Sequence, residues 1–339
     1  MNKPQNNSKK TVTADQYDRV INYLRISVTD KCNLRCIYCL PPEGIALKPK
    51  KEILTWEEIY RVVLTALDLG FTKIRLTGGE PLIRKGLIDF IVKLSALEKI
   101  TDLSLTTNGI LLKKYAHDLV KAGLKRVNIS LDTLEPDKFH WITGKEELKT
   151  VLAGIESAVS LGLSPVKLNV VVMKGINDDE IIDFIDFASV SNVWVRFIEF
   201  MPANKYTAKH KDYFISNQEI KEKIIQTGID LRPITRPLKD TVAQYYTFAD
   251  NQSRIGFISP ISRPFCSQCN KLRLTPSGLL KNCLFTKEDV DIKSCLRNSP
   301  GNEELRKIFL YCLKTKPENY DNNMSDHCGY NMAMSEIGG

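Results

Sequence analysis

Six of the nine cysteines in this 339-residue chain fall into two groups of three. Cys32, Cys36 and Cys39 form a CxxxCxxC motif, whereas Cys266 and Cys269 form a CxxC motif that Cys283 follows. Clustered cysteines in a reducing compartment usually bind metal or carry out thiol chemistry. The spacing therefore predicts two metal centres.

The first group can hold either of two metals. Three thiolates can ligate three irons of a cubane cluster and leave the fourth iron open, or they can hold zinc with a histidine or water as fourth ligand. No histidine lies within this segment, which favours the iron–sulfur cluster. The four histidines are His117, His140, His210 and His327.

The second group is ambiguous when read alone. Its spacing fits a zinc site that lacks one ligand and fits equally well a second cluster with an open iron. The other three cysteines, Cys295, Cys312 and Cys328, have no ligand spacing. We expect them to be buried small hydrophobic residues or incidental thiols.

The elements that must position these cysteines form a repeating pattern of strand and helix. Runs rich in β-branched and aromatic residues predict six strands, at 23–29, 73–77, 102–107, 125–131, 166–173 and 193–200. Amphipathic stretches predict helices at 56–70, 85–99, 114–124, 150–163 and 179–189. The first helix is marked by a capping box, Thr55 with Glu58, and by Gly70 at its end.

Six such units predict an α/β fold, either a partial barrel or an open doubly wound sheet, and both bind ligands at the carboxyl ends of their strands. We expect residues 1–16 to be a disordered lead-in and 17–202 to form the core. Residues 203–339 then form a smaller region packed on it, with hairpin-like runs at 245–249 and 254–260 and a helix at 303–314.

Composition narrows the class of protein. The chain is 43% hydrophobic and 26% charged, it has no apolar run near the roughly 18 residues that cross a bilayer, and its polar first twenty residues lack a secretory signal. We expect a soluble, cytoplasmic protein without a membrane partner. The net charge of +8 fits nucleic acid, an anionic surface or a polyphosphate substrate.

Two motifs together resemble a known family. The CxxxCxxC loop follows the first strand and has Tyr38 before its last cysteine, and GGEP at 78–81 follows the second strand. This conjunction resembles the radical S-adenosylmethionine (SAM) enzymes. The resemblance implies a partial (β/α)6 TIM-like barrel, and a [4Fe–4S] cluster on the first cysteines whose open iron binds SAM and whose electron cleaves it to a 5′-deoxyadenosyl radical.

The resemblance extends along most of the chain, through LTTNG at 105–109, FIEFMP at 197–202, CNKLRLT at 269–275 and the terminal double glycine. It is to the branch that cyclises GTP in the first step of molybdenum-cofactor biosynthesis. It implies a lyase whose radical removes hydrogen from C3′ of GTP, so that C3′ attacks C8 and (8S)-3′,8-cyclo-7,8-dihydro-GTP forms. The second cysteine group then holds an auxiliary [4Fe–4S] cluster that binds the purine.

The resemblance also implies roles for individual residues. The positions that match SAM contacts are Tyr38, Gly79, Thr106, Ser130 and Met201. The positions that match GTP contacts are Arg25, Arg75, Thr106, Lys167, Lys271, Leu272 and Arg273, with Lys271 where the family usually has arginine. Arg196 is a further candidate near the SAM carboxylate, and Gly338 and Gly339 form a tail that reaches into the active site.

The implied partners are GTP, a reducing electron donor, cyclic pyranopterin monophosphate synthase as the next enzyme, and a second copy of the chain in a homodimer. Two alternatives compete with this interpretation. One is another radical SAM enzyme with an auxiliary cluster, although such enzymes usually carry more cysteines near the C-terminus. The other is a zinc-stabilised nucleic-acid-binding protein, which leaves GGEP unexplained and lacks stacking aromatics among its basic residues.

Overall fold

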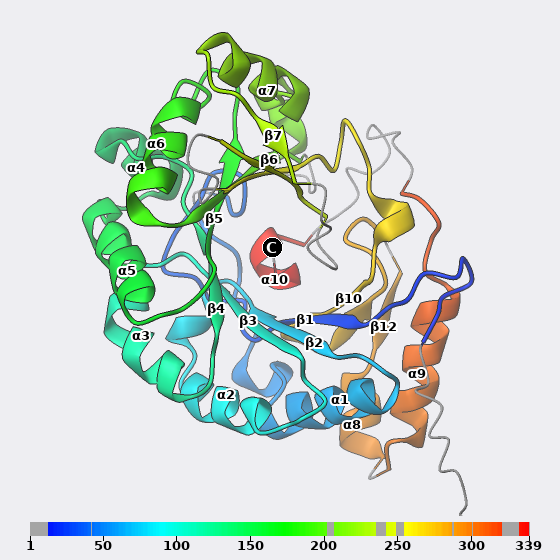
Figure 1. The fold of residues 1–339 in the computed structure, drawn as a ribbon. Coiled ribbons are helices and arrows are strands. Elements are labelled where there is room, and N and C mark those ends of the chain that lie inside the picture. Colours follow the sequence, from blue (N-terminus) through cyan, green and yellow to red (C-terminus); the bar gives the residue numbers. More distant parts are fainter. Residues whose placement is uncertain are drawn as a thin grey trace, which may run out of the picture.

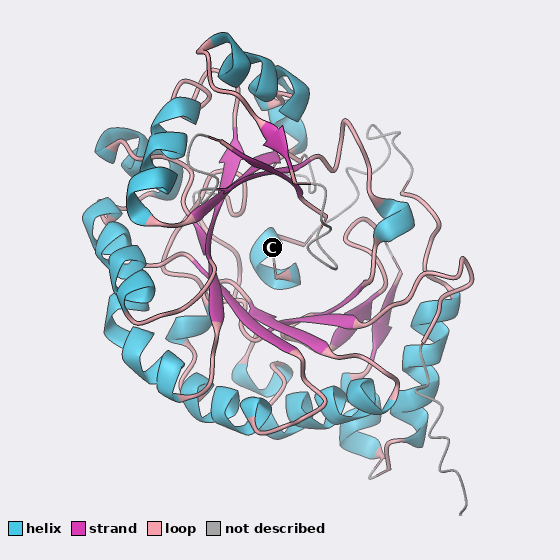
Figure 2. Cartoon of the chain, in the orientation of Figure 1, coloured by secondary structure: helices cyan, strands magenta, loops and turns pink. Residues whose placement is uncertain are grey.

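The computed structural model describes residues 13–41, 43–201, 207–234, 242–248, 254–286, 288–299, 301–320 and 332–338. Within these residues, no helix is both long and apolar enough to cross a bilayer. The fold is α/β: a curved sheet lines the inside of the molecule and helices cover its outer face (Figures 1 and 2).

The six predicted strands are present. They are β1 Tyr23–Ser27, β2 Lys73–Thr77, β3 Asp102–Thr107, β4 Arg126–Ser130, β5 Val166–Val172 and β6 Trp194–Glu199. The predicted helices between them are α1 Trp56–Asp68, α2 Leu87–Ser95, α3 Leu112–Lys121, α5 Leu148–Ser160 and α6 Ile181–Ser191, and an additional short helix, α4 Pro136–Thr143, precedes α5. The alternation of strand and helix is therefore confirmed.

The predicted start and end of α1 are also confirmed. The Thr55 hydroxyl accepts from the backbone N–H of Glu58, and the Glu58 carboxylate accepts from the backbone N–H of Thr55. Two of the helix's free N–H groups are satisfied in this way. Gly70 has a φ of +92°, a left-handed conformation that ends the helix at low cost.

The sheet is an incomplete barrel. In the described residues it has twelve strands in the order β12-β11-β10-β1-β2-β3-β4-β5-β6-β9-β8-β7, and β1 to β6 pair in parallel. Figure 1 shows these strands curving around the interior with α1, α2, α3 and α5 outside them. This settles the choice between a partial barrel and an open doubly wound sheet in favour of the barrel.

The elements after residue 203 extend the same sheet. The strands are β7 Arg232–Pro233, β8 Gln244–Thr247, β9 Arg254–Ile258, β10 Lys271–Leu274, β11 Leu279–Lys281 and β12 Asp289–Asp291, and the helices are α7 Asn217–Gln226, α8 Lys293–Asn298, α9 Glu303–Lys314 and α10 Met334–Ile337. The hairpin β8–β9 and the helix α9 match the prediction. However, β9 pairs in parallel with β6 and β10 pairs in parallel with β1, so this region continues both edges of the core and is not a separate layer.

The N-terminal boundary also differs from the expectation. Residues 1–12 lie outside the described residues, but Thr13 and Asp15 are buried. The Thr13 carbonyl accepts from the Ile21 backbone, and Asp15 pairs with Arg19 at 2.6 Å. The expected lead-in through residue 16 is therefore too long, because this turn packs against the fold.

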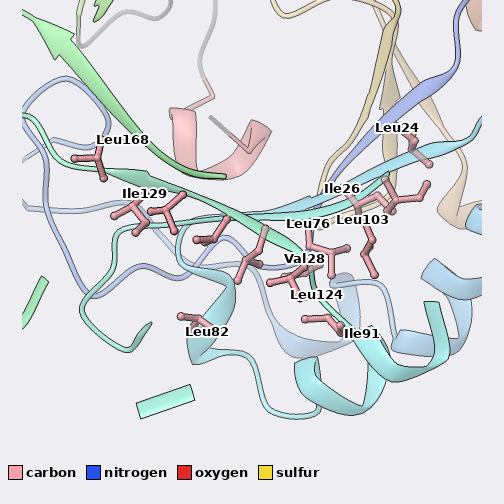
Figure 3. Packing of buried hydrophobic residues seen from close by; sticks show 14 of the residues in the cluster. Leu24, Ile26, Val28, Leu76, Leu82, Ile91, Leu103, Leu124, Ile129 and Leu168 are labelled. Atoms are coloured by element: carbon pink, nitrogen blue, oxygen red, sulfur yellow. The ribbon is translucent and has the colours of Figure 1, made fainter. Parts of the chain in front are cut away.

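The hydrophobic core lies between the sheet and the outer helices. Leu24, Ile26, Leu76 and Ile129 project from the strands toward helix residues such as Ile91 (Figure 3). Because side chains alternate along a strand, the residues between these, such as Arg25 and Arg75, face the inside of the barrel. Burial of the outer face thus fixes which side chains line the interior.

Candidate active site between two cysteine groups

The first cysteine group lies on the loop after β1, at the carboxyl end of the sheet. A second loop, which follows β2 and carries Gly78 and Gly79, packs directly against it. The Gly79 N–H donates to the Thr29 carbonyl at 2.7 Å, and a Cβ on Gly79 would stand 2.2 Å from the Lys31 carbonyl oxygen. The double glycine therefore lets the two backbones touch, and any other residue at position 79 would push the cysteine loop away.

Buried carboxylates fasten this end of the barrel. Glu80 accepts from the Thr107 hydroxyl and from the backbone N–H of Leu82 and Asn108, and the Asn108 amide lies 3.8 Å from the Cys32 sulfur. Burial raises the pKa of Glu80 to about 7. These contacts attach the cysteine loop to the ends of β2 and β3.

Tyr38 has a similar anchor. Its hydroxyl donates to Asp132 at 2.5 Å, and the second oxygen of Asp132 accepts from the Val171 backbone N–H at 2.8 Å. Burial raises the pKa of Asp132 to about 6. The last part of the CxxxCxxC loop is thus tied to the residues that follow β4 and to β5.

The second cysteine group lies at the opposite end of the barrel. Cys269 lies two residues before the start of β10, which runs parallel to β1 with Lys271 beside Tyr23. The second group therefore stands at the amino end of these strands and the first group at the carboxyl end. β1 has five residues, which at about 3.3 Å per residue separates the two groups by roughly 17 Å along the strand.

Cations surround the second group. Burial opposes ionisation of Cys269, but the ammonium groups of Lys316 and Lys271 outweigh it and lower the pKa of this thiol. The Arg19 guanidinium donates to the Cys266 carbonyl at 2.8 Å. The environment therefore favours the thiolate of Cys269, the form of cysteine that binds metal, whereas burial raises the pKa of Cys266.

A row of arginines crosses the strands between the two groups. Arg25 on β1 is in register with Arg273 on β10 and with Arg75 on β2. Burial, followed by Arg273 and Arg75, lowers the pKa of Arg25 well below its ordinary value. Like charges directly opposite one another destabilise a sheet, so an anion bound to this row would relieve a cost that the empty protein carries.

The row forms one wall of an interior cavity of about 480 Å³. The cavity also reaches the second cysteine group, all three members of which line it. Among the described residues, its only carboxylate is Asp102, which makes a two-point pair with Arg126. Its basic lining residues are Arg25, Lys73, Arg75, Arg126, Lys167, Arg196, Lys271, Arg273 and Lys316.

The opposite wall comes from β5 and β6. The Lys167 ammonium lies 4.5 Å from the centre of the Trp194 ring and donates to the Tyr245 hydroxyl at 3.2 Å. Burial, followed by the charges of Arg196 and Arg126, lowers the pKa of Lys167 to about 6. The charged form of this side chain is therefore disfavoured in the protein, and a bound anion would favour it.

The tail enters the barrel. Helix α10 lies inside the curve of the sheet (Figure 1), Met334 lines the cavity, and the backbone of Ser335 forms a hydrogen bond with Cys39. The Gly338 carbonyl accepts from Arg273 at 3.2 Å. The tail therefore stands between the cavity and the first cysteine group.

The predicted site residues separate into two sets. Those that line the cavity are Arg25, Arg75, Lys167, Arg196, Met201, Lys271 and Arg273. Lys271 and Arg273 share one face of β10. Tyr38, Gly79, Thr106 and Ser130 do not line the cavity and belong to the carboxyl-end loops and strand ends. The Leu272 side chain faces away into the core, because it alternates with its neighbours. Gly339 and Cys328 lie outside the described residues, whereas Cys295 and Cys312 are buried as predicted.

Sequence reasoning missed several lining residues, among them Lys73, Asp102, Arg126 and Lys316. The sequence did contain a signal for these lining residues: basic residues stand at every second position of short apolar strands, as Lys73 and Arg75 do. A strand whose other face is buried would otherwise carry apolar residues at both sets of positions.

Comparison with known proteins places this geometry in a family. Residues 26–188 match the radical SAM superfamily, and residues 193–322 match Molybdenum Cofactor Synthesis C. The chain is 49% identical over 326 residues to a GTP 3′,8-cyclase of Thermodesulfovibrio yellowstonii, with 96% of this chain and 99% of that protein covered. The chain belongs to the GTP 3′,8-cyclase family. A family member from Alkaliphilus oremlandii is 47% identical, over 96% of this chain and 99% of its own length.

Solved structures agree on the fold. Streptococcus suis SuiB bound to its precursor peptide SuiA superposes with a TM-score of 0.60 at 16% identity, over 93% of this chain and 69% of SuiB. At that identity the likeness concerns the fold alone. Membership of the GTP 3′,8-cyclase family, within the radical SAM enzymes, implies a [4Fe–4S] cluster and SAM.

The residues present fit those groups. The described cysteines of both groups are free of disulfides. No three His, Cys, Asp or Glu side chains in the described ranges form a site for a single metal ion, whereas a [4Fe–4S] cluster places each thiolate on a different iron. Three buried atoms have no hydrogen-bond partner among the described residues: Lys271 Nζ, Asn169 Oδ1 and Thr106 Oγ1. This is expected of atoms that a ligand satisfies.

Proposed function

We propose that this protein is a GTP 3′,8-cyclase, which converts GTP to (8S)-3′,8-cyclo-7,8-dihydro-GTP in the first step of molybdenum-cofactor biosynthesis. One observation carries the proposal: a cavity that nine lysines and arginines of the described ranges line lies inside the barrel, bordered by one cysteine group, with the other group at the far end of the same strands. A nucleoside triphosphate combines the negative charge that suits such a lining with a base that can reach a cluster.

The arginine row would bind the triphosphate. Arg25, Arg75 and Arg273 present guanidinium groups that match phosphate oxygens, and Lys167 supports them from the facing wall. Lys271 provides a point charge rather than a fork, and its buried ammonium has no hydrogen-bond partner. Binding of phosphate would both satisfy that ammonium and relieve the repulsion along the row.

Each cysteine group would hold one [4Fe–4S] cluster. Cys32, Cys36 and Cys39 would hold the cluster that binds SAM, and SAM would contact the positions Tyr38, Gly79, Thr106, Ser130 and Met201. Cys266, Cys269 and Cys283 would hold the second cluster, whose open iron takes the purine. When bound, the first cluster and SAM supply the radical that abstracts hydrogen from the ribose.

The protein's own contribution is to position the substrate and exclude water. Tail helix α10, followed by Gly338, stands beside Ser27 and Thr77 at the carboxyl ends of β1 and β2. From there it would separate the radical from solvent, with Arg273 holding the Gly338 carbonyl. A reducing electron donor, the next enzyme of the pathway and a second copy of the chain in a homodimer complete the proposed partners.

Anaerobic incubation of the reduced, reconstituted protein with GTP and SAM tests the proposal. We expect 5′-deoxyadenosine and cyclised GTP in parallel, and about eight irons per chain from two [4Fe–4S] clusters. Formation of 5′-deoxyadenosine at the same rate without GTP would argue against GTP as substrate. Stoichiometric zinc in place of iron would overturn the assignment of both clusters.

A further inference from the structure

Lys316 is a buried lysine that follows α9 and lines the cavity. Its ammonium donates to two backbone carbonyls, that of Lys271 at 3.1 Å and that of Asn282. Among the described residues it pairs with no carboxylate. A buried cation without a counter-ion is costly, so its position calls for an explanation.

The two carbonyls belong to the segments that carry the second cysteine group. Lys271 is two residues after Cys269, and Asn282 immediately precedes Cys283. The single ammonium of Lys316 therefore ties together two stretches of chain that the pairing of β10 with β11 also joins.

Neighbouring contacts attach the third cysteine to the same stretch. The Arg19 guanidinium donates both to the Cys266 carbonyl at 2.8 Å and to the Pro317 carbonyl at 2.7 Å. The Asn282 amide donates to the Thr315 carbonyl at 3.0 Å. Residues 315–318 thus form a strap that contacts the segments of Cys269 and Cys283 directly and is linked to Cys266 through Arg19, with Lys316 at its centre.

We propose that Lys316 is a positioning residue for the second cysteine group, which fixes the spacing of its cysteine segments and places a positive charge beside the cluster that they bind. This inference rests on the proposed function, which assigns a [4Fe–4S] cluster to those cysteines. A nearby positive charge stabilises the reduced, more negative cluster, and hydrogen bonding and net charge are the levers by which a protein sets a cluster potential. Lys316 therefore raises the reduction potential of this cluster.

The test uses the full chain with Cys32, Cys36 and Cys39 replaced by alanine, so that only the second cluster assembles. Lys316→Met removes the charge at similar volume, and Lys316→Arg keeps it. Lys314→Met is the matched control, because Lys314 is exposed two residues earlier and loses the same charge in solvent. The cluster's midpoint potential is measured by redox titration followed by electron paramagnetic resonance.

We expect a more negative midpoint potential in Lys316→Met, and the parent value in Lys316→Arg and Lys314→Met. An unchanged potential in Lys316→Met, or an equal shift in Lys314→Met, would overturn the inference alone. Absence of iron from the parent chain with three alanines would instead overturn the second cluster of the proposed function, and this inference with it.

If Lys316→Met binds no iron, hydrogen exchange of the cluster-free chain tests whether Lys316 positions the cysteine segments. We then expect faster exchange over residues 266–286 in Lys316→Met than in Lys314→Met, because the strap no longer holds the cysteine segments. Equal exchange in the two variants would contradict a positioning role.

Discussion

At the scale of single residues, the cavity concentrates cations whose charge the protein itself disfavours. Burial and neighbouring cations lower the pKa of Lys167 to about 6 and that of Arg196 to about 10, with burial the larger cause. Removing these side chains from water costs free energy, which is recovered only when an anion enters. Affinity for the substrate is thus linked to proton uptake.

Lys167 gives this linkage a direction. The pKa of Lys167 in the folded chain, about 6, lies below the ordinary lysine value of 10.5. Between these two pH values the folded, ligand-free chain therefore binds fewer protons than the unfolded chain. The free energy of unfolding consequently falls as pH is lowered through that window. A bound triphosphate raises the pKa again. We therefore expect GTP binding at pH 8 to take up protons, and to take up fewer in Lys167→Met.

Calorimetry in buffers of different ionisation enthalpy measures this uptake, because the slope of binding enthalpy against ionisation enthalpy counts protons. The control is an exposed lysine, Lys314→Met. The same proton uptake in Lys167→Met as in the parent would show that another group accounts for it.

At the scale of elements, strand register creates the site. Arg75, Arg25 and Arg273 come from three parts of the sequence and meet only because β2, β1 and β10 are neighbours. Strands β1 to β6 are predictable from their β-branched runs, and their alternation indicates which residues face inward. By contrast, β10, β11 and β12 have only three or four residues each. They are defined by successive pairing, β10 with β1, β11 with β10 and β12 with β11, which periodicity along the sequence does not report.

Loss of one arginine from the row should raise the stability of the nucleotide-free protein and weaken its binding of GTP. Arg25 has a like-charged neighbour on each side, so Arg25→Met should melt roughly 2 °C higher without nucleotide, since such pairs cost up to about 1 kcal/mol. The same variant should bind GTP about tenfold or more weakly, because a charge-assisted hydrogen bond contributes roughly 1.5–3 kcal/mol.

Scanning calorimetry and equilibrium binding check the two halves of this prediction separately. Lys73→Met is a useful comparison. Lys73 lies two residues before Arg75 on β2, and its cross-strand neighbour on β1 is Tyr23 rather than an arginine. A lower melting temperature for Arg25→Met would show that its contacts outweigh the repulsion.

The tail predicts a second result at this scale. Gly338 has a φ of +80°, and a Cβ there would lie 2.8 Å from side-chain carbons of both Ser27 and Thr77. Gly338→Ala should therefore displace the tail and break the bond from Arg273, with loss of cyclised product but full iron content. Deletion of residues 338–339 should do the same.

Product formation and iron analysis on the same preparation distinguish these effects. Gly228→Ala is a matched control, because Gly228 also has a positive φ, +86°, but a Cβ there would meet no atom of the other described residues within 4 Å, its two chain neighbours apart. Full turnover by Gly338→Ala would mean that the tail is not needed for the reaction. A loss of iron would instead show that it supports the clusters.

At the scale of the whole molecule, the chain forms one continuous sheet. The regular alternation of strand and helix ends at about residue 202, so the sequence pattern does change there. Spatially, however, the later strands cover both edges of the earlier ones, β10 beside β1 and β9 beside β6. Sequence patterns report local structure, and these two pairings are made between residues far apart in the chain.

We therefore expect residues 1–202 not to fold alone. Both β1 and β6 would become exposed edges, which favour aggregation, and core residues such as Leu272 would leave uncovered apolar surface. Near-ultraviolet circular dichroism and a melting curve of this fragment check the prediction, with co-expression of 203–339 as the rescue. A cooperative transition of the isolated fragment near that of the full chain would contradict it.

The position of the two cysteine groups at opposite ends of β1 and β10 has a consequence for how such enzymes could diversify. The length of these strands sets how large a molecule can reach from one group to the other. Because side chains alternate with a period of two, an insertion of two residues into neighbouring strands lengthens that reach by about 6.6 Å and keeps the same faces inward. Substrate size in this architecture can therefore change in discrete steps, while an insertion of one residue would turn the arginine row into the core.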